Sequence, residues 1–167
     1  ECSAMIEKHL GNVIDIHGGG QDLIFPHHEN EMAQGMCVHD TKEYSRTWIH
    51  NGFVTVEGRK MSKSLNNVVI VNEILKKFPG ESIRLALLTA HYRQPLDWNS
   101  NTLIQAKKTL DNLYDILQEN LDIEPKPSEE TLVEKHLKED INTPAALSEL
   151  YILAKKLHAS SDQNVKS

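Results

Sequence analysis

Hydrophobic and polar positions divide this 167-residue chain into an alternating first part and a helical second part. In the first part, a β-branched run at 12–16 predicts a short buried strand after a helix at 3–10. A helix over 27–39 and a strand or hairpin over 48–56 follow, and the Glu-Gly pair at 57–58 predicts a turn. Such alternation of helices and strands is typical of an α/β fold.

From residue 71 the apolar positions follow helical spacing to the end of the chain. The predicted helices cover residues 72–78, 81–92, 102–121, 131–139 and 145–158. Two prolines within the segment 124–128 (EPKPS) predict a linker between the third and fourth of these helices. Pro144 falls near the first turn of the last helix, with Asn142 or Thr143 as its cap.

Composition narrows the class of protein. No run of about 18 apolar residues occurs, which excludes a membrane-spanning helix, so no membrane partner is expected. Two cysteines, Cys2 and Cys37, are too few for a disulfide scaffold, which favours a reducing compartment such as the cytoplasm. We expect Cys37 to be a small buried hydrophobic residue. Because the chain begins with Glu1 rather than Met, we expect it to be a piece of a longer protein.

The net charge of −6 conceals three zones of different sign. Residues 1–58 carry three basic and nine acidic side chains, residues 59–108 carry nine basic and three acidic ones, and the remainder carries six and twelve. A basic zone between acidic flanks suits an anionic partner such as nucleotide phosphate or an RNA backbone. Solvated helix faces would produce the same pattern, so charge alone leaves both interpretations open.

The segment Pro26-His-His-Glu-Asn-Glu31 could bind a metal. On a helix, His27 and Glu31 are four residues apart and project from one face. The Cys2 thiolate could complete the set if the chain folds back, and zinc suits this mixture of sulfur, nitrogen and oxygen donors. The alternative is an ordinary polar helix start, in which the carboxylates oppose the positive end of the helix dipole.

Two further segments could bind a nucleotide. At 17–23 (HGGGQDL), glycines after a strand would let a ligand approach the backbone, and Asp22 could accept from ribose hydroxyls. A glycine turn with an aspartate cap is the alternative. At 60–64 (KMSKS), we expect a loop in which Lys60 and Lys63 could meet the charge that develops on a departing pyrophosphate. A surface loop rich in lysine and serine is the alternative there.

Several segments together resemble one family. KMSKS at 60–64 is identical to a signature of class I aminoacyl-tRNA synthetases. The combination of ECSAM at 1–5, HGGGQDL at 17–23, FPHHENE at 25–31 and KMSKS resembles cysteinyl-tRNA synthetase, and DINTPAA at 140–146 is similar to the start of that family's DALR-type helical domain. The resemblance extends over nearly the whole chain.

The resemblance implies roles for individual residues. Cys2, His27 and Glu31 would bind a catalytic zinc ion, with a fourth ligand from an upstream cysteine, and the zinc would receive the thiolate of substrate cysteine. His17 would lie near the substrate amino acid. Gly20 and Asp22 would face the adenosine of ATP, and Lys63 would bind ATP, with magnesium expected beside the phosphates. The family's HIGH motif does not occur in this chain.

The resemblance also implies an architecture and a function. Residues 1–70 would be the second half of a Rossmann-like catalytic domain, 71–123 a helical stem-contact region, and 124–167 a linker and the start of a helical tRNA-binding domain. The expected activity is ATP-dependent formation of cysteinyl-adenylate and transfer of cysteine to tRNA(Cys), and residues 1–167 alone are expected to be inactive. Two alternatives are a related ligase that joins cysteine to an amino sugar and a zinc- or RNA-binding module without catalysis.

Overall fold

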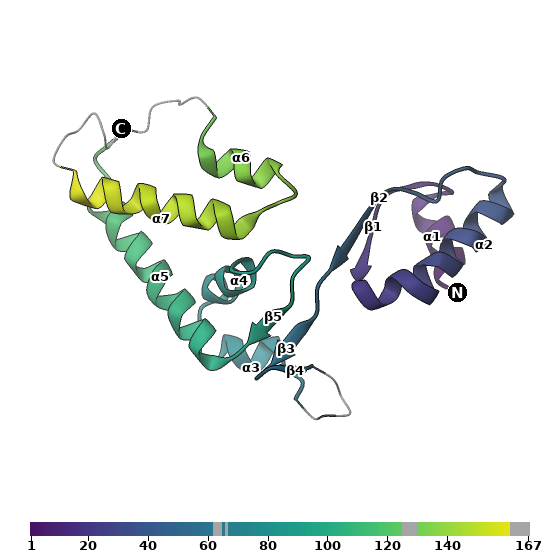
Figure 1. Ribbon diagram of the computed structural model, residues 1–167, viewed down its shortest axis with the longest axis horizontal. Helices are drawn as coiled ribbons and strands as arrows, with labels where there is room; N and C mark the ends of the chain where they lie inside the picture. Colours follow the sequence, from purple (N-terminus) through teal and green to yellow (C-terminus); the bar gives the residue numbers. More distant parts are fainter. Residues whose placement is uncertain (62–64, 66, 125–129, 161–167) are drawn as a thin grey trace. The chain divides into compact units, whose positions relative to one another are not determined.

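The computed structural model describes residues 1–61, 65, 67–124 and 130–160, which form two compact units. Unit 1 comprises residues 1–53 with 92–94, and unit 2 comprises residues 54–91 with the chain from Pro95 onward. Figure 1 shows the helices and strands that make up each unit. The expected mixture of helices and strands is confirmed.

A parallel pair of strands with a helical crossover forms the centre of unit 1. β1 (Ile14–Gly20) pairs in parallel with β2 (Ser45–Asn51), and α2 (Glu29–His39) lies between them in sequence. The short helical turns η1 (Gln21–Leu23) and η2 (Ile24–His28) lead from β1 into α2. Parallel strands require such a crossover connection, which is the basic element of an α/β fold.

The first strand differs from its prediction in two ways. It begins at Ile14 and continues through all three glycines to Gly20, whereas the sequence predicted that it would end at residue 16. Backbone pairing with β2 explains the extension, because ladder hydrogen bonds need no side chains. Ile14 is buried, but Ile16 is 63% exposed, so the expected burial of the whole run was wrong.

Helix α1 (Cys2–Leu10) packs against α2 at the start of the chain. It ends at Gly11, whose φ of 93° lies in the left-handed region that glycine adopts without strain. Ser3 Oγ donates to Gln34 Oε1 at 2.9 Å, and His39 Nε2 lies 3.5 Å from Glu7 Oε2. These contacts at two points along the helix pair hold the N-terminal residues against α2.

Unit 2 contains a three-stranded sheet in the order β4-β3-β5. β3 (Val54–Val56) and β4 (Arg59–Lys60) form an antiparallel hairpin, and β5 (Leu96–Trp98) pairs with β3 in parallel. The turn predicted at 57–58 is confirmed, and both of its residues have positive φ, as in the turns that suit tight hairpins. The sequence prediction missed β5, because three residues are too few to show a strand pattern.

Among the described residues of unit 2, five α-helices follow the hairpin. They are α3 (Val71–Leu75), α4 (Gly80–Leu88), α5 (Ser100–Gln118), α6 (Leu132–Lys138) and α7 (Thr143–Ala159). All five were predicted, with ends that differ by a few residues. Asn142 caps α7 by accepting from the Ala145 N–H at 3.2 Å, as expected from its position before Pro144. Residues 125–129 of the predicted linker lie outside the described residues.

The apolar core of unit 2 lies among α4, β5 and α5. Its buried members are Ile83, Leu85, Ala86, Trp98, Leu103 and Ala106. Partly buried residues of β3 and α3 pack around this cluster. None of the described helices is both long and apolar enough to cross a bilayer.

Candidate metal centre

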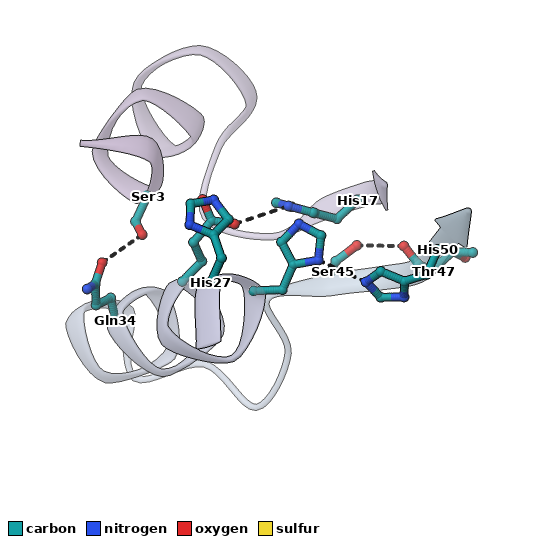
Figure 2. A network of polar contacts seen from close by, with 9 residues as sticks. Ser3, His17, His27, Gln34, Ser45, Thr47 and His50 are labelled. Atoms are coloured by element: carbon teal, nitrogen blue, oxygen red, sulfur yellow. Dashed lines mark hydrogen bonds and ion pairs between the residues drawn. The ribbon is translucent and has the colours of Figure 1, made fainter. Parts of the chain in front are cut away.

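The centre of unit 1 is a buried carboxylate between two imidazoles. Glu31 is only 5% exposed and lies in the first turn of α2. His27 Nε2, one helical turn earlier, lies 3.2 Å from Glu31 Oε1, and His17 Nε2 on β1 lies 3.1 Å from Oε2. Figure 2 shows His17 reaching from its strand and His27 from its helix toward the same carboxylate. A charged group buried this deeply requires partners of this kind.

Cys2 joins this group from α1. One donor atom each from Cys2, His27 and Glu31 lies within 4.8 Å of the others. In a tetrahedral zinc site, donors about 2.0–2.3 Å from the ion are about 3.3–3.8 Å apart, so small side-chain movements would suffice. The contact between Ser3 and Gln34 ties the first turn of α1 to α2 and thereby keeps Cys2 beside His27.

The donor chemistry also fits a metal ion. Thiolate, imidazole and carboxylate form a set that zinc accepts, and three protein ligands leave a fourth position open. Glu31 Oε2 is buried and has no hydrogen bond among the described residues, because its contact with His17 lacks hydrogen-bond geometry. A buried carboxylate oxygen without a hydrogen bond is costly unless another group satisfies it.

A second set of possible ligands shares the same carboxylate. Donor atoms of His17, His28 and Glu31 also lie within 4.8 Å of one another. Both sets use Glu31, and only the set with Cys2 contains the soft donor that zinc favours. We therefore place His17 and His28 beside the centre, as neighbours of the carboxylate rather than as ligands.

His17 and His28 belong to a group of packed rings that also contains Trp48 and His50. The centroid of His17 is 4.5 Å from that of His28 and 4.8 Å from that of Trp48. His28 Nδ1 and His50 Nε2 are 2.8 Å apart and share a hydrogen bond, and His50 stacks on Trp48 with 9° between the ring planes. Burial lowers the pKa of His28, and the neighbouring His17 and His50 imidazoles lower it further. His28 is therefore held in its neutral form at neutral pH.

Two glycines allow the rings of His28 and Tyr44 to lie close to the backbone. A Cβ on Gly19 would lie 2.8 Å from His28 Cε1, and one on Gly35 would lie 2.4 Å from Tyr44 Cδ2. Gly35 follows Glu31 by one helical turn, so the Tyr44 ring lies against the same face of α2. Burial raises the pKa of the Tyr44 phenol, and the nearby Glu31 carboxylate raises it further.

Of the other residues predicted to bind nucleotide, Gly20 and Asp22 belong to unit 1 and Lys60 belongs to unit 2. Gly20 ends β1, and Asp22 lies in η1, where its Oδ1 would be 2.6 Å from a Cβ on Gly20. The backbone of Lys60 pairs with Thr55 in the hairpin of unit 2. Lys63 and its two serine neighbours lie outside the described residues.

Sequence reasoning missed His28, His50 and Trp48 as parts of this centre. Trp48 and His50 are two positions apart on β2 and therefore face the same side of the strand, which is a signal that the sequence did contain. Cys37 was expected to be buried but is exposed. The buried residues of α2 are Glu31 and Gly35, and two residues beyond Gly35 a helix has turned Cys37 away from that face.

Comparison with known proteins identifies the class. A family model described as the class I (C) tRNA synthetase catalytic domain matches residues 1–108. The chain belongs to this family of synthetase catalytic domains.

Individual relatives agree with this assignment. The chain is 53% identical over 170 residues to a cysteine–tRNA ligase of Parvibaculum lavamentivorans, covering 100% of the chain and 36% of that relative. It is 53% identical over 155 residues to a cysteine–tRNA ligase of Maricaulis maris, covering 92% and 34%. The chain thus spans about a third of the length of the curated relatives it matches.

Solved structures show the same fold at lower identity. A leucyl-tRNA synthetase of Agrobacterium radiobacter, in a ternary complex with tRNA and LeuAMS, matches 91% of this chain with a TM-score of 0.71 and 22% identity, over 23% of its own length. A methionyl-tRNA synthetase of Mycobacterium tuberculosis with methionyl-adenylate matches 92% with a TM-score of 0.58 and 17% identity, over 37% of its length. The predicted Rossmann-like synthetase fold is confirmed.

Proposed function

We propose that this chain forms part of a cysteine–tRNA ligase, which activates cysteine with ATP and transfers it to tRNA(Cys). The observation that carries the proposal is the convergence of Cys2, His27 and Glu31 in unit 1, because this donor set suits an ion that selects a thiol substrate. Membership of the class I (C) family and the 53% identity to cysteine–tRNA ligases support the same function.

Zinc is the proposed cofactor of this centre, with Cys2, His27 and Glu31 as its ligands from this chain. When bound, it would supply a soft Lewis acid that prefers the sulfur of cysteine to the hydroxyl of serine. His17, 3.1 Å from Glu31, would border the substrate amino acid. The packed rings of His28, Trp48 and His50 would exclude water from one side of the centre.

ATP is the proposed second substrate, with contacts proposed for residues of the segments 17–23 and 60–64. Asp22 at the end of the glycine strand would accept from the ribose, and Gly20 would allow the adenosine to approach the backbone. Lys60 and Lys63 would stabilise charge on the phosphates as pyrophosphate leaves, with magnesium as a counter-ion. The basic zone at 59–108 supports this assignment and a tRNA contact.

The domain roles proposed from the sequence follow the same assignment. Residues 1–70 would supply the catalytic half that contains the metal centre. Residues 71–123 would contact the tRNA stem, and residues 124–167 would begin the helical tRNA-binding domain. The two helices α6 and α7 pack against each other, as a helical domain requires.

A chimera tests the function directly. Residues 1–167 would replace the matching 36% of the Parvibaculum lavamentivorans ligase, which the 53% identity makes compatible. We expect cysteine-dependent ATP–pyrophosphate exchange and charging of tRNA(Cys). Exchange without tRNA charging, but with transfer of cysteine to an amino sugar, would favour the related ligase. A folded chimera without exchange would contradict both enzymes and favour a binding module.

A single substitution in the chimera tests the proposed ATP contact. Lys63→Ala should slow pyrophosphate exchange by about 10²-fold, because one stabilising contact to the transition state is lost. Lys42→Ala is the matched control, since Lys42 is an exposed lysine of unit 1 outside the proposed site. Equal rates for the two variants would contradict the role of Lys63.

Residues 1–167 alone should show no detectable cysteine-dependent exchange. This chain contains the KMSKS segment but not the HIGH motif, which in the family binds ATP from the opposite side. Both motifs are needed to position ATP. The assay is pyrophosphate exchange by the purified chain beside the chimera. Robust exchange by the chain alone would show that the HIGH motif is unnecessary.

A further inference from the structure

The carboxylate of Asp97 on β5 binds the turn of the β3–β4 hairpin. Its Oδ1 accepts from the Gly58 N–H at 2.7 Å and from Thr55 Oγ1 at 2.8 Å. These donors and the Asn99 amide hold the pKa of Asp97 below its usual range, with the Gly58 N–H the largest cause. Asp97 is exposed, so water alone could satisfy its carboxylate. Three protein donors bind it instead, which holds the carboxylate in one position relative to the turn.

The same carboxylate also connects the hairpin to α5. Asp97 Oδ2 accepts from Asn99 Nδ2 at 3.2 Å, and Asn99 Oδ1 accepts from the Thr102 N–H at 2.9 Å. Asn99 is the N-cap of α5, and Thr102 lies in its first turn. One polar chain therefore runs from the turn at Gly58 through Asp97 to the start of the long helix.

The turn that Asp97 binds sets where β4 begins. Glu57 and Gly58 have φ values of 50° and 73°, a tight geometry that an acceptor for the Gly58 N–H stabilises. β4 follows at once, with Lys60 opposite Thr55 in the ladder. Asp97 therefore contacts the first strand and the turn of the hairpin whose second strand contains Lys60, the first lysine of the proposed ATP segment.

We propose that Asp97 is a positioning residue for ATP binding, which fixes the β3–β4 turn and thereby the backbone of Lys60 on β4. This inference rests on the proposed function, since it assumes that Lys60 stabilises the phosphates of ATP. It predicts an effect on ATP that does not extend to cysteine, because the metal centre of unit 1 shares no hydrogen bond with Asp97 among the described residues.

Two substitutions separate the contacts of this carboxylate. Asp97→Ala removes the carboxylate that accepts from the Gly58 N–H and from Thr55 Oγ1. Asp97→Asn keeps an oxygen for Gly58 and Thr55, but it places an amide donor against the Asn99 amide, so it loses only the connection to α5. Asp111→Ala is the matched control, because Asp111 is an exposed aspartate on α5 paired with Lys107.

The first readout is amide hydrogen exchange of Gly58 in residues 1–167. Asp97→Ala should accelerate this exchange by about tenfold or more, since the N–H loses its acceptor. Asp97→Asn and Asp111→Ala should leave it within about threefold of the parent chain. Unchanged exchange in Asp97→Ala would overturn the contact itself, whatever the enzyme does.

The second readout is pyrophosphate exchange by the chimera. Asp97→Ala should raise the KM for ATP by about tenfold while the KM for cysteine stays constant, because misplaced contacts weaken positioning of one substrate. Asp97→Asn should restore most of the ATP affinity. Suppose that the parent chimera is active but its Asp97→Ala variant has an unchanged KM for ATP, or an equal rise in KM for ATP and for cysteine. Either result would overturn the positioning role alone. An inactive parent chimera would overturn the proposed function and this role with it.

Discussion

The two units bury different kinds of side chains. In unit 1 the buried residues include His28, Glu31 and Ser45, with Ile14 and Tyr44 as the buried hydrophobic side chains. In unit 2 the buried cluster consists of aliphatic side chains and one tryptophan. Apolar burial is the main source of stability in a folded domain. Unit 1 therefore relies on polar partners and close ring packing, whereas unit 2 has a conventional core.

This difference fits the proposed division of labour. A buried carboxylate without a full set of partners lowers the free energy of unfolding, and a metal ion bound there would offset this loss. A preformed polar centre can bind an ion or substrate with little rearrangement. Unit 2 instead contains the hairpin and α5, whose Asn99 cap continues the polar chain from Asp97.

Ile83→Ala tests the conventional core with the largest expected loss of stability. Ile83 is 6% exposed on α4, and removing its side chain should cost about 2–5 kcal/mol in the free energy of unfolding of unit 2. The measurement is urea unfolding followed by NMR signals of each unit. Leu87→Ala, on the same helix but 47% exposed, is the control and should cost much less. Equal losses for the two variants would contradict the assigned core.

Gly35→Ala tests the close ring packing of unit 1. The new methyl group would lie 2.4 Å from the Tyr44 ring, so the ring or the helix must move, at a cost of about 1–3 kcal/mol. Thermal unfolding of unit 1 measures the effect. Gly18→Ala is the control within the same unit, because its Cβ would meet only the Ile49 backbone oxygen at an ordinary 3.5 Å. A stabilised Gly35→Ala chain would show that Tyr44 does not pack as described.

Acid should destabilise α6 of unit 2, by less than either substitution above. The Thr131 N–H and hydroxyl donate to Glu134 and lower the pKa of this carboxyl below its ordinary 4.5. A carboxyl with a lowered pKa in the folded state stabilises above its ordinary pKa, and this contribution disappears as the pH falls through the folded value. Amide exchange in α6 between pH 6 and pH 3 measures it. Glu134→Ala should remove the pH dependence, and an unchanged profile would refute the capping box.

Local patterns in the sequence predicted part of the cluster of possible metal ligands in unit 1. The spacing of His27 and Glu31 on one helix depends only on helical geometry, and the structure brings these residues together with Cys2. The turn at 57–58 and the Asn142 cap are also local features, and both are confirmed.

Features that depend on distant contacts could not be predicted in the same way. The glycines at 18–20 extend β1 only because β2 pairs with them. His28 meets His50 across 22 residues, and no short-range pattern specifies that contact. Cys37 is exposed because packing of Tyr44 on Gly35 selects the buried face of α2.

Zinc content tests the central claim most directly. Residues 1–167 would be purified with zinc, dialysed and analysed for bound metal, and X-ray absorption would count sulfur ligands. We expect about one zinc ion with one protein sulfur ligand, held by Cys2, His27 and Glu31. Cys2→Ser should lose most of this metal, whereas Cys37→Ser, which changes the exposed cysteine, should retain it. Zinc binding that survives Cys2→Ser, or that is lost with Cys37→Ser, would contradict the proposed centre.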